Sequence, residues 1–365
     1  MSRYEWIKLL SSYQISEPSS PHVGLFPMTR THVSGLYQRQ DSCLFGSASI
    51  AYILLDLFPN FTHKEQHLVK KIYQNICALY PVYQNALGRK TYNFWQTKPP
   101  TAFPNGYFLH RFTHFRLPDD LDDTALVVLT SEPDQNETYS LAQAFTGKYQ
   151  KKKFPNIHNS YYAFLPDEDA IYQTWFGEKM PLEFDFCVLC NWMTYALRHV
   201  KTLQGSDLAT LQFIQTQLRT SKWLSNPFDI SRHYGTSYWI TYYFARLYKA
   251  HPTYFSDNLV ENVRDYCFSQ IQTSTFHKMK DVIWLLAYLK LGGRWAKEVE
   301  LSLSMHKEKF PVFLGAFLAP YTHRVPAVWV RAKGTRLEWI SEALNLTFLL
   351  EANILLNTSV QSQQN

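Results

Sequence analysis

The sequence predicts an all-α protein in which about twelve helices form hairpins closed into a toroid of the (α/α)6 type. Apolar residues recur at three- and four-residue steps along most of the chain, whereas stretches with strand-like alternation are scarce. The composition is 46% hydrophobic and 16% aromatic, enough to bury a large core. An open stack of hairpins would also fit, but no sequence period of about 34–47 residues supports a repeat array. These observations favour the closed ring.

Each predicted helix follows from the same apolar spacing. In the segment 64–80, for example, Val69, Ile72 and Ile76 fall on one face, and Pro81 ends the helix. A short strand is expected only around 325–330. The helices are expected at 3–13, 36–57, 64–80, 118–131, 136–146, 183–201, 207–219, 228–249, 256–271, 278–290, 294–306 and 338–356.

The chain is predicted to form a single domain over residues 1–356. Its 365 residues exceed the usual ~100–200 per domain, but no shift of composition marks a boundary, and each hairpin of a toroid extends the same core. Residues 357–365 are rich in Ser and Gln and are expected to form a flexible tail. The long aromatic segment 91–117, interrupted by prolines, is expected to be a lid or a wall of a site.

The distribution of charge and the amino-terminal sequence indicate which partners and which compartment to expect. The net charge of +6 is spread along the chain without a basic cluster interleaved with aromatics, which argues against nucleic acid. Such a charge is compatible with peripheral contact to an anionic membrane. The amino terminus does not resemble a secretion signal, and the longest apolar run, 48–58, is too short to span a bilayer. With five cysteines, these features predict a cytoplasmic protein with reduced thiols.

The most unusual segment is acidic. Residues 118–125 read Pro-Asp-Asp-Leu-Asp-Asp-Thr-Ala, and an apolar run follows. Pro118 suits the first turn of a helix, so the acids are expected at a helix start. One or two aspartates would serve as caps, but four carboxylates repel one another. Crowding and burial raise the pKa of such groups and keep a proton available near neutral pH.

Residues 120–125, Asp-Leu-Asp-Asp-Thr-Ala, resemble the D-x-D-D-T-A motif of class II terpene cyclases, whose catalytic domains are helical toroids. The resemblance implies that Asp122 is the acid that protonates a terminal alkene or epoxide of a polyprenyl substrate. It further implies that Asp120 and Asp123 hold and polarise Asp122. Protonation needs no cofactor, and Mg²⁺ enters only if the substrate carries a diphosphate.

Beyond these six residues the chain departs from the family pattern. The Gln and Trp repeats of triterpene cyclases are absent, and the length allows one helical domain, as in single-domain bacterial cyclases. Asp119, Asp120 and Asp123 also match D-D-x-x-D, the magnesium motif of class I terpene synthases. That family needs a second acidic metal motif on a later helix, and none is found. The class I interpretation is therefore weaker.

The helix expected at 183–201 carries a second group of polar residues. Asn191 is expected to be hydrogen-bonded in the core or to the catalytic acid, as the resemblance implies. Cys187 and Cys190, with Asp185, resemble part of the zinc site of protein prenyltransferases, and His233 or His251 would complete it. Asp185 and Cys187 would point to nearly opposite helix faces, and no second cysteine pair exists, so no metal site is predicted.

Aromatic side chains supply candidate substrate contacts. Tyr234, Tyr238 and Tyr242 recur at four-residue steps and would form one helical stripe. Such stripes are usually core, but facing a cavity they would stabilise a carbocation by cation–π attraction of about 2 kcal/mol. Trp192 and Trp239 are further candidates of the same kind.

Three hypotheses follow. The first is a cyclase acting on a hydrophobic polyprenyl molecule. The second is a carbohydrate-active toroid enzyme, with Asp122 or Asp123 paired with Asp185 or Glu183 and with aromatics stacked on sugars. The third is a toroidal binding protein in which the acids are structural.

Overall fold

The structure is a computed structural model that describes residues 2–20, 22–101, 116–131, 135–148, 171–177, 180, 183–200, 202–297, 299–316 and 327–361. It is mostly helical, as the sequence predicts, and it adds a four-stranded antiparallel sheet that the periodicity did not indicate.

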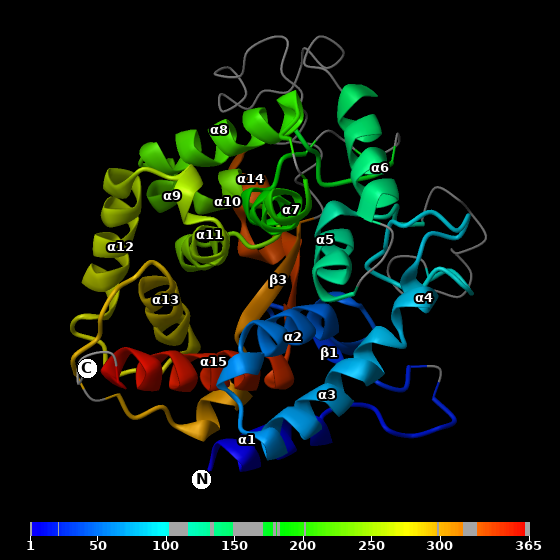
Figure 1. Cartoon of the computed structure of the whole chain (residues 1–365). Coiled ribbons are helices and arrows are strands. Elements are labelled where there is room, and N and C mark those ends of the chain that lie inside the picture. The colour runs from blue at the N-terminus through cyan, green and yellow to red at the C-terminus, as the bar shows by residue number, and fades with distance from the viewer. Residues whose placement is uncertain are drawn as a thin grey trace.

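Six helices pack side by side in a closed order, in which each contacts the next and the last returns to the first. Much of α2 and all of α5 are buried, and apolar residues lie on all sides of both helices apart from the acidic first turn of α5. Figure 1 shows α7 and α11 nearly end-on in the middle of the view. In order, the six are α2 (Phe45–Asp56), α5 (Leu121–Thr130), α7 (Phe186–His199), α11 (Ser237–Ala250), α13 (Met279–Lys290) and α15 (Glu342–Gln361).

Amphipathic helices cover the outside of this ring of contacts. Helix α3 buries Val69, Ile72 and Ile76 on one face only, which is typical of a surface helix. In Figure 1, α8 and α12 lie outside α7, α11 and α13, and α1 and α3 lie outside α2 and α15. These outer helices are α1 (Arg3–Ser12), α3 (His63–Cys77), α6 (Gln135–Lys148), α8 (Gly205–Arg219) and α12 (Asp257–Ile271). The short helices are α4 (Tyr80–Tyr83), α9 (Lys222–Ser225), α10 (Pro227–Ile230) and α14 (Ala327–Arg331).

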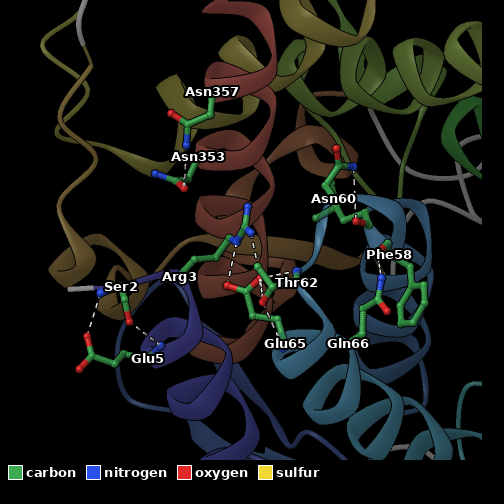
Figure 2. Close-up of polar contacts among 11 residues, drawn as sticks. Ser2, Arg3, Glu5, Phe58, Asn60, Thr62, Glu65, Gln66, Asn353 and Asn357 are labelled. Carbon is green, nitrogen blue, oxygen red and sulfur yellow. Dashed lines mark hydrogen bonds and ion pairs between the residues drawn. The ribbon is translucent and has the colours of Figure 1, made fainter. Parts of the chain in front are cut away.

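Capping boxes fix the starts of two outer helices. Ser2 and Glu5 bond reciprocally at α1, and Thr62 and Glu65 do so at α3, so orphan amides of both helices are satisfied (Figure 2). Arg3 joins the two helices through a bidentate bond to Glu65, at 3.0 and 2.8 Å. The first turns of α1 and α3 are therefore locked together.

The sheet has the order β2–β1–β4–β3 and joins distant parts of the chain. Its strands are β1 (Met28–His32), β2 (Gln38–Asp41), β3 (Pro311–Ala316) and β4 (Arg336–Ile340). Central strands β1 and β4 pair in the register Thr29↔Ile340. Phe313 of β3 packs on Phe45, the first residue of α2, with ring centroids 5.3 Å apart. The sheet thus lies at the end of the ring where the inner helices begin.

Contacts between side chains show how three of these helices are aligned. Phe45, at the start of α2, packs on Tyr234, which precedes α11. Asp56 closes α2 and contacts Lys249 and Lys290 near the ends of α11 and α13. The starts of α2 and α11 therefore lie together, and so do the ends of α2, α11 and α13.

Several predicted boundaries are wrong where tertiary pairing overrides local periodicity. The helix expected at 36–57 starts at Phe45, because 38–41 pairs as β2, and that expected at 338–356 is preceded by β4. Residues 228–249 break into α10 and α11. Residues 294–306 contain no α-helix among those described, only the 3-10 turn Leu303–Lys307. The strand expected around 325–330 is helical from Ala327, and residues 325–326 lie outside the described part.

Two further expectations concern segments that the structure covers in part. Helix α15 continues to Gln361, five residues past the tail boundary expected after Leu356. Residues 102–115 of the proposed lid segment lie outside the described residues, whereas 91–101 pass close to the start of α5.

Charged side chains are buried where the inner helices end. Lys290 is 6% exposed and Glu351 is 1% exposed, and their Nζ and Oε1 atoms lie 2.5 Å apart. The Tyr242 hydroxyl donates to the other oxygen of Glu351 at 2.9 Å. Burial lowers the pKa of Lys290, but the carboxylates of Glu351 and Asp56 more than offset this effect and raise it. Lys290 is therefore a buried cation held by two anions.

Replacing Lys290 by Met should destabilise the protein strongly, because Glu351 would stay buried without its cation. Removing one partner of a buried pair typically costs ~3–5 kcal/mol. The matched control is Lys249→Met, which also removes a partner of Asp56 but at a site 38% exposed, where the loss should be below about 1 kcal/mol. Urea unfolding of both variants measures the difference, and equal losses would contradict the assignment.

Candidate active site at the start of helix α5

Asp122 lies in the first turn of α5 and is 4% exposed. Two buried donors hold its carboxylate. The Asn191 amide of α7 donates to Oδ1 at 2.6 Å, and the Tyr234 hydroxyl, from the turn before α11, donates to Oδ2. Three segments far apart in the sequence therefore meet at one carboxyl group.

The pKa of Asp122 is raised to about 6. Burial is the largest cause, since a charged carboxylate loses its hydration. The hydrogen bonds from Tyr234 and Asn191 act in the opposite direction, as does the positive charge of His233, while the negative charge of Asp185 adds to the rise. Asp122 therefore exchanges its proton close to neutral pH.

Asp120 and Asp123 contact each other rather than Asp122. Asp120 is the N-cap of α5 and accepts from the Asp123 amide at 2.8 Å. Burial raises the pKa of Asp120 to about 7, against the hydrogen bonds from Asp123. Burial and the neighbouring charges of Asp120 and Asp122 raise the pKa of Asp123 well above its usual value. The direct partners of Asp122 are Asn191 and Tyr234, so the predicted holding role of Asp120 and Asp123 is not seen as a contact.

Thr124 and Asp119 fasten the motif to the segment before it. The Tyr92 amide donates to Oγ1 of Thr124 at 2.9 Å. Asp119 accepts from Thr91 at 2.5 Å, from Asn93 at 3.4 Å and from Asn85. The four aspartates therefore have different roles. Asp119 is bonded to the preceding segment, and Asp120 caps α5 and bonds the Asp123 amide. Asp122 is held by α7 and by the turn before α11.

Asp185 places the turn that carries Tyr234. As the N-cap of α7 it accepts from the amides of Cys187 and Val188 at 3.0 and 3.3 Å. It also accepts from the Ser231 hydroxyl at 2.6 Å and the His233 amide at 2.9 Å. Burial raises its pKa despite these donors and the charge of His233. One carboxylate therefore ties the start of α7 to residues 231–233.

Gly235 completes this turn. Its φ is +62°, which favours glycine, and a Cβ there would lie 2.6 Å from Leu314 of β3. A side chain at this position would strain the backbone and would require Leu314 to shift.

A buried ion pair lies beside the acid. Glu183 accepts from the Trp175 indole at 2.7 Å and from His233 Nε2 at 3.1 Å, and Arg232 lies 3.9 Å away. Burial raises the pKa of Glu183, but His233 and Arg232 outweigh it and lower the pKa to about 2. Burial lowers the pKa of His233, and Glu183 and Asp185 overcome this and raise it to about 9. At neutral pH this is a His⁺–Glu⁻ pair.

Aromatic rings surround Tyr234. Its ring lies 4.6 Å from Tyr243, 6.0 Å from Phe45 and 5.9 Å from Phe313, all in edge-on geometry. Phe94 stacks on Phe313 at 5.2 Å. Aromatic side chains from α2, α11 and β3 thus surround Tyr234, the hydrogen-bond donor to Asp122.

The other predicted substrate-binding residues lie elsewhere. Tyr234 precedes α11, so it does not share a helical stripe with Tyr238, which packs on Trp284 and Phe310. The Trp239 indole donates to the Pro311 carbonyl at 3.1 Å. Trp192 packs on Tyr172 and Tyr195 inside the core. Asn191 and Tyr234 alone, of the five predicted, contact Asp122.

Sequence reasoning missed the roles of Glu183 and His233 and the hydrogen bond of Tyr234. The sequence offers His233 only as a zinc ligand, whereas in the structure His233 is hydrogen-bonded to Glu183. Burial raises the pKa of the Cys187 and Cys190 thiols well above the usual value. Among the described residues, no three His, Cys, Asp or Glu side chains are grouped to hold a metal.

No protein-family model matches the chain, and no curated protein matches it in a sequence comparison. The resemblance to class II terpene cyclases therefore rests on residues 120–125. Within the described ranges, no helix is long and apolar enough to cross a membrane.

Asp185→Ala should destabilise the protein by roughly 3 kcal/mol or more. The change removes a helix cap, worth ~0.5–2 kcal/mol, and leaves buried donors of Ser231 and His233 unpaired at ~1–3 kcal/mol each. Asp257→Ala, in the exposed first turn of α12, is the control and should cost less than about 1 kcal/mol. Thermal and urea unfolding give the comparison, and a mild loss for Asp185→Ala would refute its bracing role.

The stability of Asp122→Asn relative to wild type should increase with pH. The folded pKa of Asp122, about 6, exceeds its ordinary value of 3.8, so its stabilising contribution is complete below pH ~4 and disappears as pH rises through ~6. The amide of the variant stays neutral, so its contribution to stability does not change over this pH range. One unit of pKa corresponds to about 1.4 kcal/mol, so the difference should reach roughly 3 kcal/mol by pH 7. Urea unfolding at pH 4, 5.5 and 7 tests this, and a difference independent of pH would contradict it.

Proposed function

We propose that this chain is an acid-initiated cyclase of hydrophobic polyprenyl substrates, similar in mechanism to class II terpene cyclases. The observation that carries the proposal is the state of Asp122. Its carboxyl is buried, its pKa lies close to neutrality, and it is held between Asn191 and Tyr234. A carboxylic acid kept neutral in this way can act as a proton donor.

In the proposed first step, Asp122 transfers its proton to the less substituted carbon of the terminal double bond of the polyprenyl chain. The π electrons form the new C–H bond, and the adjacent, more substituted carbon becomes the cation. The carboxylate that remains gains from the donors already aimed at it, Asn191 and Tyr234, and from the nearby charge of His233. Stabilising the charge that develops favours the transfer. Ring closure would follow by attack of the next double bond.

The surroundings of Asp122 support a carbocation mechanism. Phe45, Phe313 and Tyr243 lie around Tyr234, and aromatic faces attract cations by ~2 kcal/mol or more when water is excluded. We infer that the closed order of α2, α5, α7, α11, α13 and α15 is that of an α/α toroid, with Asp122 at the start of α5. In this proposal the protein is cytoplasmic with peripheral membrane contact, and Mg²⁺ enters only for a diphosphate substrate.

The carbohydrate hypothesis has less support. It requires a second carboxylate free to act on the substrate. Asp185 accepts four hydrogen bonds, and Glu183 is engaged by Trp175 and His233. With a pKa of about 2, Glu183 would also be too weakly basic to take up a proton at neutral pH.

The test is turnover of a panel of linear polyprenols, their diphosphates and squalene by wild type and Asp122→Asn. Loss of the general acid should reduce cyclisation by ~10²–10⁴-fold, with folding retained. Asp281→Asn is the control, because Asp281 lies in the first turn of another inner helix, α13. Cyclic product from Asp122→Asn at the wild-type rate would overturn the proposal, as would the failure of wild type to cyclise any member of the panel.

A further inference from the structure

Four exposed apolar side chains lie at the end of the sheet where the turn between β1 and β2 meets the segment before β4. Val33 and Leu36, in the turn, are 52% and 93% exposed, and Val328 and Trp329 of α14 are 72% and 60% exposed. We call these four residues the sheet-end patch. Trp329 differs from the other nine tryptophans of the chain, which are at most 8% exposed. Exposed apolar patches mark surfaces that contact a protein or a membrane.

Hydrogen bonds hold the two parts of the sheet-end patch next to each other. Nε2 of His32, at the end of β1, donates to the Gly334 carbonyl at 3.1 Å. The Trp329 carbonyl in turn accepts from the Thr335 hydroxyl at 3.0 Å, so α14 stays close to the residues that precede β4. Val330 of the same helix is buried and packs at the end of β3. The apolar residues of α14 are therefore divided, and Val330 fixes the helix to the sheet while its two neighbours remain in solvent.

The exposed charges beside the sheet-end patch are mainly basic. Lys333 follows α14 and Arg39 lies on β2, and both are exposed. Arg331 of α14 is 47% exposed and forms an ion pair with Asp229. Glu338 of β4 is an acidic residue near this surface, and it is partly buried. The surface therefore combines exposed apolar groups with a surplus of positive charge, which complements an anionic partner.

These features fit a lipid surface better than a protein surface. Each side of a stable protein interface contributes roughly 20–30 residues, and lysine is depleted there. The sheet-end patch has four apolar residues on a turn and a short helix, with Lys333 beside them. Tryptophan is enriched where proteins meet the headgroup layer of a membrane, and basic residues attract anionic lipids.

We propose that the sheet-end patch binds an anionic membrane surface. Leu36 and Trp329 enter the boundary between headgroups and acyl chains, and Lys333 and Arg39 lie against the lipid phosphates. This inference rests on the peripheral membrane contact of the proposed function, to which it gives a surface, but it does not depend on the cyclase reaction. Binding of this kind grows with the buried apolar area and with the attraction between basic residues and anionic lipids.

Sedimentation with vesicles tests the proposal. Wild type should bind vesicles of phosphatidylcholine and phosphatidylserine, mixed at about 7:3, at least about tenfold more tightly than pure phosphatidylcholine. The double variant Leu36→Ser/Trp329→Ser should bind the mixed vesicles roughly tenfold or more weakly than wild type. Lys333→Gln should lose roughly fivefold, as expected for one basic residue near the surface. The control is Leu208→Ser, which removes a 55% exposed leucine from α8 and should bind like wild type.

Fluorescence reports whether Trp329 itself enters the lipid. The difference in emission between wild type and Trp329→Phe isolates this side chain, because the other tryptophans are buried. On addition of the mixed vesicles this difference should shift to shorter wavelength, and brominated acyl chains should quench it. The double variant removes only exposed side chains, so its melting temperature should match that of wild type, which separates lost binding from lost folding.

Three results would overturn the membrane surface. They are a wild type that binds neither kind of vesicle, a double variant that binds as tightly as wild type, and a dimer of wild type that the double variant dissociates. In the last case the sheet-end patch would be covered by a second copy of the chain. Cyclisation of a polyprenol by wild type that does not bind vesicles would overturn this inference alone. Vesicle binding without cyclisation of any polyprenyl substrate would overturn only the proposed cyclase.

Discussion

The organisation of the site depends on the burial of one carboxyl group, Asp122. Removing a carboxylate from water is unfavourable, and folded proteins tolerate it only if the group is neutral or well hydrogen-bonded. Asp122 meets both conditions, because its raised pKa favours the neutral form and two donors bind its oxygens. Burial raises the pKa of Asp122 to about 6, and Asn191 and Tyr234 prevent a still larger rise. The same two donors that hold the acid in place also stabilise its conjugate base. The group can therefore release a proton and take one back within a narrow range of pH.

The neighbouring acids show how a crowded cluster is kept stable. Asp119 and Asp185 are satisfied by donors from loops and helix ends, while Asp120 and Asp123 form a cap and its partner. Glu183 is neutralised by His233. The other acids thus have local structural roles, whereas Asp122 is held by side chains of α7 and of the turn before α11. This separation of tasks explains why four aspartates can occupy five positions at one buried helix start.

Two kinds of buried polar group lie at different places in the ring. At the start of α5, Asp120, Asp122 and Asp123 are carboxyls whose pKa values are raised. Near the ends of α2 and α13, Lys290 instead forms ion pairs with Asp56 and Glu351. Arg246, whose guanidinium lies over the rings of Tyr52 and Tyr243, adds a further buried charge. The largely apolar helices of the ring thus enclose polar groups of both kinds.

The sequence by itself determined the helical character, most helix positions and the acidic segment 118–125, because apolar spacing and residue type are local properties. For Asn191 the sequence left two alternatives, a partner within the core or the acid, and the structure shows the bond to Asp122. Tertiary structure decided the sheet, because strands 28–32 and 336–340 are paired across almost the whole chain. Tertiary structure also decided that Tyr234 bonds Asp122 and that Glu183 binds His233. The positions of Tyr234 and His233 depend on the positive φ of Gly235 and on the hydrogen bond from the His233 amide to Asp185. Such contacts depend on distances between residues 50 to 112 apart in the chain, which no local pattern encodes.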